Sequence, residues 1–269
     1  MTRVDTAAIA DAFVTARLAA GTLAAFPGAI PPDMDSAYAC QDAAIGLWPD
    51  RIAGWKVGWI SDEYHARYGE RRLVGPIFAA NIVEVRGEEP ATMPVCAGGF
   101  CAVEAEYVFE LARDVAPGGT EWRADTVGEL IRQLRLGIEI ASSPLPSIND
   151  LGPTVTACDF GNNAGLVISA PYADWRRTLE LARNCECLLN GVRVGSGGAA
   201  SIAGGPLAGL AFALNRNARR GRTLRAGELI TTGAATGVHP AAPGQLAVAR
   251  FGPAGALSCR LVAAQPRHR

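Results

Sequence analysis

The chain has 269 residues, of which 49% are hydrophobic and 19% charged, and its formal net charge at pH 7 is −1. This composition is typical of a globular protein with a sizeable core and excludes an intrinsically disordered chain. The near-zero charge argues against a broad electrostatic surface for nucleic acid. We therefore expect one large domain, or a main domain with a small appendage, and no nucleic-acid partner.

The cysteines and the first residues indicate a reduced compartment. Seven cysteines are present, an odd number, and the only close pair is Cys185 and Cys187, with no histidine cluster at zinc spacing. The opening stretch, MTRVDTAAIADAF, carries acids where a signal peptide would be apolar. No apolar run approaches the roughly 18 residues of a membrane span. We expect a cytoplasmic protein that does not bind a membrane.

The first 50 residues are expected to be helical. Residues 5–21 have a helical pattern with Asp5 as N-cap candidate, and residues 33–48 form a second pattern after a Pro-Pro break. Residues 51–60, RIAGWKVGWI, are predicted as a strand, and a short helix follows from Asp62 to Tyr68. We place a soft boundary near residue 50, which divides a helical N-terminal region (1–50) from a mixed-sheet catalytic domain (51–269).

Strands are expected to dominate the second region. A helix with Pro206 in its first turn is predicted over residues 205–220, and an amphipathic helix over residues 124–135. A hairpin turns at Asn190-Gly191. The predicted strands are 75–85, 100–112, 136–141, 154–160, 164–169, 227–233, 245–251 and 256–262. Many strands with few interleaved helices favour an α+β fold over a doubly wound parallel sheet.

Three acids form the most informative pattern. Glu104 and Glu106 lie two apart in a predicted strand, so their side chains leave the same face. Glu139 sits alone in the apolar segment LGIEIA, where a buried carboxylate needs a partner. A divalent cation would compensate such a set, and oxygen ligands favour Mg²⁺ or Mn²⁺ over zinc. The alternative is a strand with one solvent-facing side, as Glu110 on the same face would allow.

Lys56 is the only lysine of the chain, so 24 of the 25 basic residues are arginine. It lies in the aromatic segment GWKVG, which argues against an ordinary surface cation. Burial can lower the pKa of a lysine, so that it exchanges a proton near neutral pH, whereas arginine cannot do this. We therefore consider a catalytic role for Lys56 beside the alternative that it survives by drift.

Two further patterns are weaker. Gly195, Gly197 and Ala200 fit G-x-G-x-x-A, but the preceding strand is half of a hairpin and no second βα unit follows, so a close-packed loop is favoured over a dinucleotide site. His65 could approach the strand that carries Lys56, yet no G-x-S-x-G nucleophile motif accompanies it. A triad hydrolase is not expected.

Seven motifs in order resemble the 2-keto-4-pentenoate hydratase family of the fumarylacetoacetate hydrolase superfamily, over about residues 5 to 263. The motifs are GWKVG, GPIF, VEAEYVFEL, GIEIA, ACDFGNNAGLVIS, GGPLAGLAFALN and LRAGELITTGAATGVHP with FGPAGALSCRL.

The resemblance implies a mixed β-sheet rolled into a barrel-like core, with a small helical N-terminal region. It also implies a divalent metal, Mg²⁺ or Mn²⁺, on Glu104, Glu106 and Glu139, and an active-site lysine at Lys56. Asp159, Asn162 and Asn163 stand where the family lines its substrate site. The family acts on 2-oxo or 2-hydroxydienoic acids from the catabolism of aromatic compounds, and its members suggest a homo-oligomer.

The chemistry of these residues agrees with the resemblance. A 2-oxo acid can chelate a cation that stabilises its enolate, while a lysine moves the proton between enol and ketone and water adds to the distal double bond. The leading interpretation is a lyase that hydrates a 2-hydroxy-2,4-dienoate to a 4-hydroxy-2-oxo acid.

Three alternatives stay open beside the hydratase: a decarboxylase of a related 2-oxo diacid, a C–C bond hydrolase of an acylpyruvate-like acid, and a non-catalytic subunit complexed with a pathway enzyme. The segment GPIFAANIV lacks the acid that relatives carry after GPIF, since Ala79, Ala80 and Asn81 stand there. This departure puts the activation of water in question.

Overall fold

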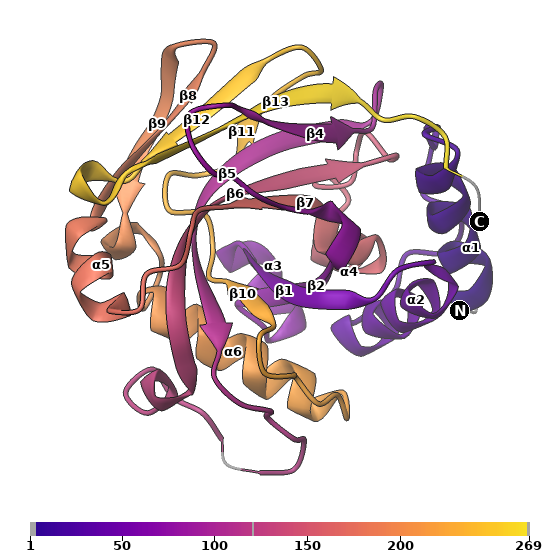
Figure 1. Ribbon diagram of the computed structural model, residues 1–269. Coiled ribbons are helices and arrows are strands. Elements are labelled where there is room, and N and C mark those ends of the chain that lie inside the picture. The colour runs from indigo at the N-terminus through magenta and orange to yellow at the C-terminus, as the bar shows by residue number, and fades with distance from the viewer. Residues whose placement is uncertain (1–3, 120, 268–269) are drawn as a thin grey trace.

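Two β-sheets form the body of the protein, and the computed structural model describes residues 4–119 and 121–267 (Figure 1). The larger sheet is mixed, with strand order β2-β1-β10-β5-β6-β7-β3 and with β11 paired to β5. Its strands are β1 (Ile52–Trp59), β2 (Arg72–Phe78), β3 (Ile82–Glu84), β5 (Phe100–Leu111), β6 (Ile131–Ser143), β7 (Asn163–Ile168), β10 (Leu229–Thr231) and β11 (His239–Pro240). This sheet rolls into a half-barrel, and the expected α+β fold with a barrel-like core is confirmed.

The smaller sheet packs across the first one and has strand order β4-β13-β12-β8-β9 (Figure 1). Its strands are β4 (Ala91–Val95), β8 (Asn184–Leu189), β9 (Val192–Gly198), β12 (Leu246–Arg250) and β13 (Ala256–Ala263). The predicted hairpin at Asn190-Gly191 joins β8 to β9, with both turn residues at positive φ. Strand β4 has no counterpart among the strands predicted from the sequence.

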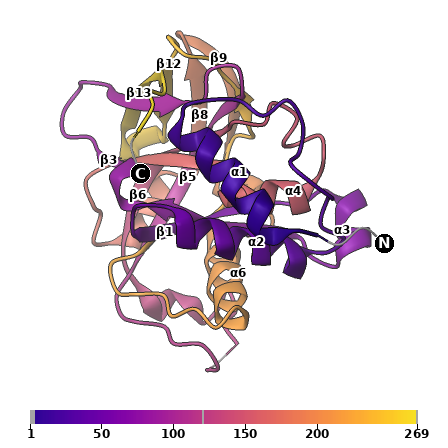
Figure 2. The same cartoon turned by 90° about the vertical axis from the view of Figure 1, so that its right-hand side faces the viewer.

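Six α-helices flank the sheets in the described part of the chain: α1 (Thr6–Leu18), α2 (Met34–Leu47), α3 (Asp62–Tyr68), α4 (Pro153–Cys158), α5 (Trp175–Leu181) and α6 (Pro206–Arg219). Asp5 caps α1 as predicted, because its carboxylate accepts a hydrogen bond from the Ala8 amide at 3.0 Å. Figure 2 shows α1 and α2 together on one flank of the molecule. The division into regions 1–50 and 51–269 stays a prediction.

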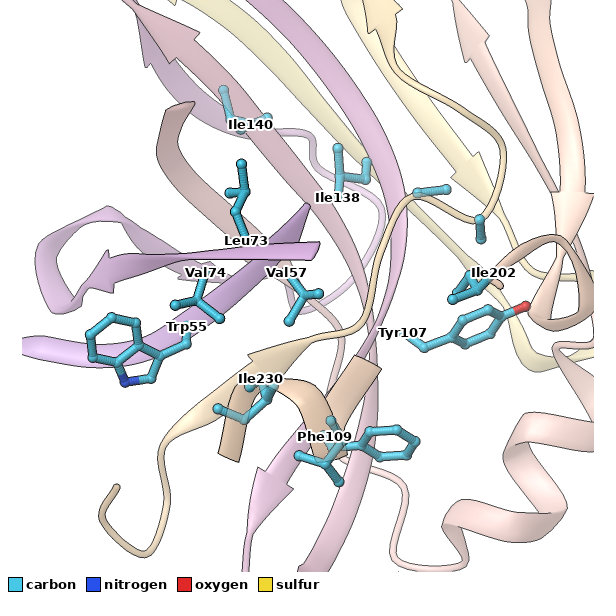
Figure 3. Packing of buried hydrophobic residues seen from close by; sticks show 14 of the residues in the cluster. Trp55, Val57, Leu73, Val74, Tyr107, Phe109, Ile138, Ile140, Ile202 and Ile230 are labelled. Atoms are coloured by element: carbon cyan, nitrogen blue, oxygen red, sulfur yellow. The ribbon is translucent and has the colours of Figure 1, made fainter. Parts of the chain in front are cut away.

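The central strand β5 is buried on both faces. Val103, Ala105, Tyr107 and Phe109 point into the main core, which also includes residues of the smaller sheet. Figure 3 shows Tyr107 and Phe109 in this cluster together with Trp55 and Val57 of β1. The opposite face of β5 looks into the half-barrel, so any polar side chain on it is removed from bulk water.

The amphipathic helix predicted over residues 124–135 is wrong. A short 3₁₀ turn covers Val127–Leu130, and β6 begins at Ile131. Residues 131–135 pair with the last third of β5, for example Leu134 with Phe109. Thirteen residues of β6 form one long ladder, and this pairing outweighs the local helical preference.

Two predicted strands also differ from the structure. Residues 154–160 contain α4, because Pro153 starts a helix after Gly152 at φ 94°, and the Ala157 carbonyl accepts a hydrogen bond from Gln41 Nε2 at 2.8 Å. The strand expected over residues 75–85 is broken by a turn at Ala79–Asn81. There the Ala80 amide donates to Asp50 Oδ2 at 2.8 Å, which separates β2 from β3.

Candidate functional site

Glu104 and Glu139 are direct cross-strand partners on the inner face of the half-barrel. Glu104 is 6% exposed and Glu139 is fully buried. Like charges directly opposite each other destabilise a sheet, and burial adds to the cost of their ionised forms. Burial raises the pKa of Glu104 to about 7; the Lys56 ammonium opposes this rise and the Glu139 carboxylate adds to it. The structure thus has the crowded acids that the sequence pattern predicts.

Glu106 lies on the same face, two residues further along β5, and is fully buried. Its Oε2 accepts hydrogen bonds from the amides of Thr232 at 3.0 Å and Gly233 at 2.8 Å. Its Oε1 has no hydrogen-bond partner among the described residues. Burial and then the carboxylates of Glu139 and Glu104 raise the pKa of Glu106 well above its ordinary value. This carboxylate therefore has one oxygen held by protein and one available to a ligand.

The amides that hold Glu106 belong to a segment that leaves the sheet. Strand β10 pairs with β5 at Val108–Glu110, and β11 pairs with it at Ala102–Val103. Between these two pairings, residues 232–238 run away from β5, with the Ala235 amide still donating to the Ala105 carbonyl at 2.8 Å. The departure opens the sheet beside the acids and leaves room there for a cavity.

Lys56 reaches the acids from β1. Its Nζ forms an ion pair with Glu139 Oε1 at 3.1 Å, and the residue is 5% exposed. Burial alone would lower the pKa of Lys56, but the carboxylates of Glu139 and Glu104 outweigh it and raise this pKa above its ordinary value. In this arrangement the carboxylates thus favour the ammonium form of Lys56, which is the reverse of the lowered pKa considered from the sequence.

Thr231 completes the contacts of Glu139, and the sequence patterns do not single it out. Its Oγ1 donates to Glu139 Oε2 at 3.0 Å and accepts from the Val57 amide at 3.4 Å. The residue is fully buried at the end of β10. Glu139 is thereby fixed between β1 and β10, which orients the carboxylate that binds Lys56.

A cavity of about 670 Å³ opens above Lys56 and Glu104. Its wall includes Val57, Trp59, Arg72 and Asn162. The size is suited to a small organic molecule. The charged side chains at this cavity are Lys56, Glu104 and Arg72, so a small anion with an apolar body would fit its chemistry.

The three residues expected to bind substrate are separated by the structure. Asn162 lines the cavity, and its Oδ1 has no hydrogen-bond partner among the described residues. Asn163 is buried in β7, where its Nδ2 donates to the Gly165 carbonyl at 3.5 Å. Asp159 is fully buried in an ion pair with Arg17 of α1 and accepts a hydrogen bond from the Ser143 hydroxyl. Asn162 alone of the three faces the cavity.

Other candidates from the sequence lie outside the cavity lining. Ala79–Asn81, where relatives are expected to carry an acid, form a turn held by Asp50 and are not among the residues that line the cavity. His65 lies in α3 with a buried Nδ1 that has no partner among the described residues. Gly195 and Gly197 belong to β9 and pack against residues 235–239, as the close-packed alternative predicts.

Arg72 and Trp59 line the cavity without having been predicted to do so. Both stand at strand ends, Trp59 as the last residue of β1 and Arg72 as the first of β2. Nothing in their local sequence pattern marks a ligand site, since an arginine and a tryptophan near a turn are common on ordinary protein surfaces.

The acids fit a divalent cation by chemistry and charge. Three buried carboxyl groups share one ammonium, and the raised pKa values of Glu104 and Glu106 indicate that their ionised forms lack sufficient compensating charge. Glu106 Oε1 has no partner among the described residues and could ligate a cation. Within residues 4–119 and 121–267, no three His, Cys, Asp or Glu side chains stand close enough together to hold one ion. Glu104, Glu106 and Glu139 would therefore gather on a cation only after side-chain rotation.

Comparisons with known proteins bear on the fold and on the family resemblance. None of the protein-family models matches the chain. The TodF product hydratase of Pseudomonas putida strain F1 is 27% identical over 227 residues, which are 80% of this chain and 79% of the relative. This sequence similarity supports the family resemblance that was inferred from the seven motifs.

Solved structures share the fold. The 4-oxalocrotonate decarboxylase of Pseudomonas putida G7, solved with calcium and acetate and with magnesium and adipate, superposes with a TM-score of 0.79 over 97% of this chain and 99% of that one, at 21% and 22% identity. The fumarylpyruvate hydrolase of Pseudomonas aeruginosa, solved with Mn²⁺ and pyruvate, has a TM-score of 0.56 at 16% identity and covers 80% of this chain and 91% of that one.

The chain thus has a hydratase among its sequence relatives and shares the fold of the solved 4-oxalocrotonate decarboxylase and fumarylpyruvate hydrolase. The family resemblance seen in the sequence is thereby confirmed, with a hydratase as the sequence relative. The seven cysteines are all free and buried. Among the described residues, no helix is both long and apolar enough to cross a bilayer.

Proposed function

We propose that this protein is a divalent-metal-dependent lyase that hydrates a 2-hydroxy-2,4-dienoate to a 4-hydroxy-2-oxo acid. The observation that carries the proposal is the group formed by Lys56, Glu139 and Glu104 at the base of a cavity of about 670 Å³. The similarity to the TodF product hydratase supports the reaction type. The magnesium and manganese ions bound by the solved relatives support Mg²⁺ or Mn²⁺ as the cofactor.

A cation on Glu104, Glu106 and Glu139 would supply Lewis-acid stabilisation of negative charge on the substrate's 2-oxygen and carboxylate. Lys56 Nζ would move the proton between the 2-hydroxyl and C5, and water would then add at C4. The raised pKa of Lys56 suits the donor half of this role. The Asn162 amide and the apolar walls would orient the diene.

Decarboxylation of a 2-oxo diacid is the second candidate, because the decarboxylase of Pseudomonas putida G7 covers 97% of this chain. In both reactions the 2-oxo group of the substrate accepts negative charge. The hydrolase alternative has less support, since His65, the base considered for it, does not line the cavity. The non-catalytic alternative is opposed by the ion-paired Lys56.

An NMR time course with 2-hydroxypenta-2,4-dienoate tests the proposal directly, with Mg²⁺ in one sample and EDTA in the other. We expect Mg²⁺-dependent formation of 4-hydroxy-2-oxopentanoate. A parallel sample with 2-oxohex-3-enedioate reports decarboxylation by the release of carbon dioxide. If neither substrate is consumed with any divalent cation, the proposed lyase is wrong.

A further inference from the structure

Arg72 is the second cation of the cavity wall, at the end away from the acids. It is the first residue of β2 and the direct cross-strand partner of Trp59, the last residue of β1. Trp59 follows Lys56 by three positions, so Arg72 starts roughly 10 Å along the strand from the lysine and on the opposite face of the strand pair. Its guanidinium meets the cavity wall at the Ala203 carbonyl. Val57, Leu73 and Ile202 line the cavity as well. The cavity thus has charged groups at two places and apolar walls beside them.

The guanidinium of Arg72 has no counter-ion. It donates one hydrogen bond to the Ala203 carbonyl and lies 5.2 Å from the centre of the Trp59 ring. Among the described residues, no carboxylate lies within ion-pair distance of it. Burial lowers the pKa of Arg72, with no acidic partner to offset this. A partly buried cation on a cavity wall that lacks a partner is a receptor for an anion.

The neighbouring arginine shows the contrast. Arg71 also approaches Trp59, at 5.9 Å from its ring centre, but its guanidinium is paired with Asp62 at 2.5 Å. Arg71 is absent from the cavity lining. Two consecutive arginines therefore share the same tryptophan, while one is neutralised by an acid and the other faces the cavity.

We propose that Arg72 binds a second, distal carboxylate of the substrate, so that the preferred substrate is a dicarboxylic 2-hydroxydienoic or 2-oxo acid. The Ala203 carbonyl and the Trp59 ring hold the guanidinium at the wall, and its remaining N–H groups receive the carboxylate. This inference rests on the proposed function, because the other end of the molecule must bind beside Lys56. It makes Arg72 a specificity residue.

Binding of unreactive ligands tests the inference without relying on turnover. We would titrate the full chain with 2-oxohexanedioate and 2-oxohexanoate by calorimetry in the presence of Mg²⁺, since these saturated acids differ only at the distal end. We expect the diacid to bind at least about tenfold more tightly. Arg72→Met should lose this preference through weaker binding of the diacid, with the affinity for the monoacid within about twofold. Arg71→Met is the matched control and should keep the preference.

The outcomes distinguish a failure of the inference about Arg72 from a failure of the proposed function. If both acids bind equally and Arg72→Met changes neither affinity, the inference about Arg72 is wrong and the 2-oxo acid site stands. If wild-type protein binds neither acid with Mg²⁺, the proposed function is wrong and the inference falls with it. If Arg72→Met does not fold, as judged by its thermal transition, Arg72→Lys replaces it: the charge is kept without the paired donors, and the preference should shrink but persist.

Discussion

Glu104 and Glu139 face each other across adjacent strands with Lys56 bound to one of them, and all three side chains are almost completely buried. The ammonium neutralises one negative charge of a set that includes Glu106. The remaining charge is what a divalent cation would offset. The metal binding and proton transfer that we propose would therefore depend on the same few side chains as the stability of the metal-free protein.

The acids of β5 should be required for metal binding. Replacing Glu104 and Glu106 together by Gln removes two charged oxygen ligands, so we expect Mg²⁺ binding to fall below detection in calorimetry. Glu110→Gln is the matched control, because Glu110 lies on the same strand face but is paired with Arg135 at 3.4 Å. Unchanged Mg²⁺ affinity in the double variant would rule out the assigned ligands.

Lys56→Arg should keep the positive charge and lose turnover. Arginine can pair with Glu139, but its guanidinium is a much poorer proton donor than the ammonium of lysine, so we expect kcat to fall by about 10²-fold or more while the thermal transition stays close to that of wild type. Steady-state kinetics with a 2-hydroxydienoate measures this. A variant with near-normal kcat would contradict the proton-transfer role.

A variant of Asp159 should change the stability of the protein, whereas a variant of Asn162 should change ligand binding. Asp159→Asn breaks a buried ion pair with Arg17, and we expect the free energy of unfolding to fall by about 3 kcal/mol. Asn162→Gly keeps the backbone at φ 64° without strain and removes only the amide that faces the cavity. It should weaken 2-oxo acid binding about threefold to tenfold while unfolding changes by less than about 1 kcal/mol.

Chemical denaturation and calorimetry on the two variants give these values. The opposite result, with ligand binding lost in Asp159→Asn at wild-type stability, would restore Asp159 as a substrate residue and contradict its structural role.

Glu228 should make the stability depend on pH, independently of the acids in the cavity. Burial raises the pKa of Glu228 to about 7, so the folded protein holds this proton more tightly than the unfolded chain does. Stability is therefore lost as pH rises from about 4.5 through 7. Glu228→Gln cannot ionise and should remove about 2 kcal/mol of this pH-dependent loss, after allowance for its partial exposure.

Denaturation curves of wild type and Glu228→Gln at pH 5 and pH 8 test this. Glu180→Gln, on the exposed face of α5, serves as control and should leave the pH dependence unchanged. Parallel curves for Glu228→Gln and wild type would show that Glu228 ionises at its ordinary pKa.

The sequence predicts the inner face of the site better than its walls. Glu104, Glu106 and Lys56 can be found because strand alternation fixes which side chains share a face, and a lone lysine or an acid in an apolar strand is chemically unusual. Arg72 and Trp59 cannot be found in this way, since their place at the cavity depends on how the ends of β1 and β2 meet residues 201–203.

The incorrect predictions from the sequence have a common cause. Residues 124–135 carry a helical pattern, and Thr154 and Val155 favour a strand, yet long-range pairing with β5 and a proline at a helix start determine the outcome. The motif around Asn162 also contains Asp159, which suggests a substrate contact for both. The partner of Asp159 is Arg17, which lies 142 positions away and cannot be inferred from local spacing.

The segment that leaves the sheet at Thr232 holds Glu106 through main-chain amides alone. Main-chain donors are the same whichever side chain follows, so Ala234 and Val238, which line the cavity from this segment, can be exchanged without releasing the carboxylate. Within this one short segment, the main-chain amides hold Glu106 and the side chains line the cavity, so the two contributions can change independently. Exchanges at Ala234 and Val238 can therefore reshape the cavity wall while the main-chain amides keep Glu106 in place.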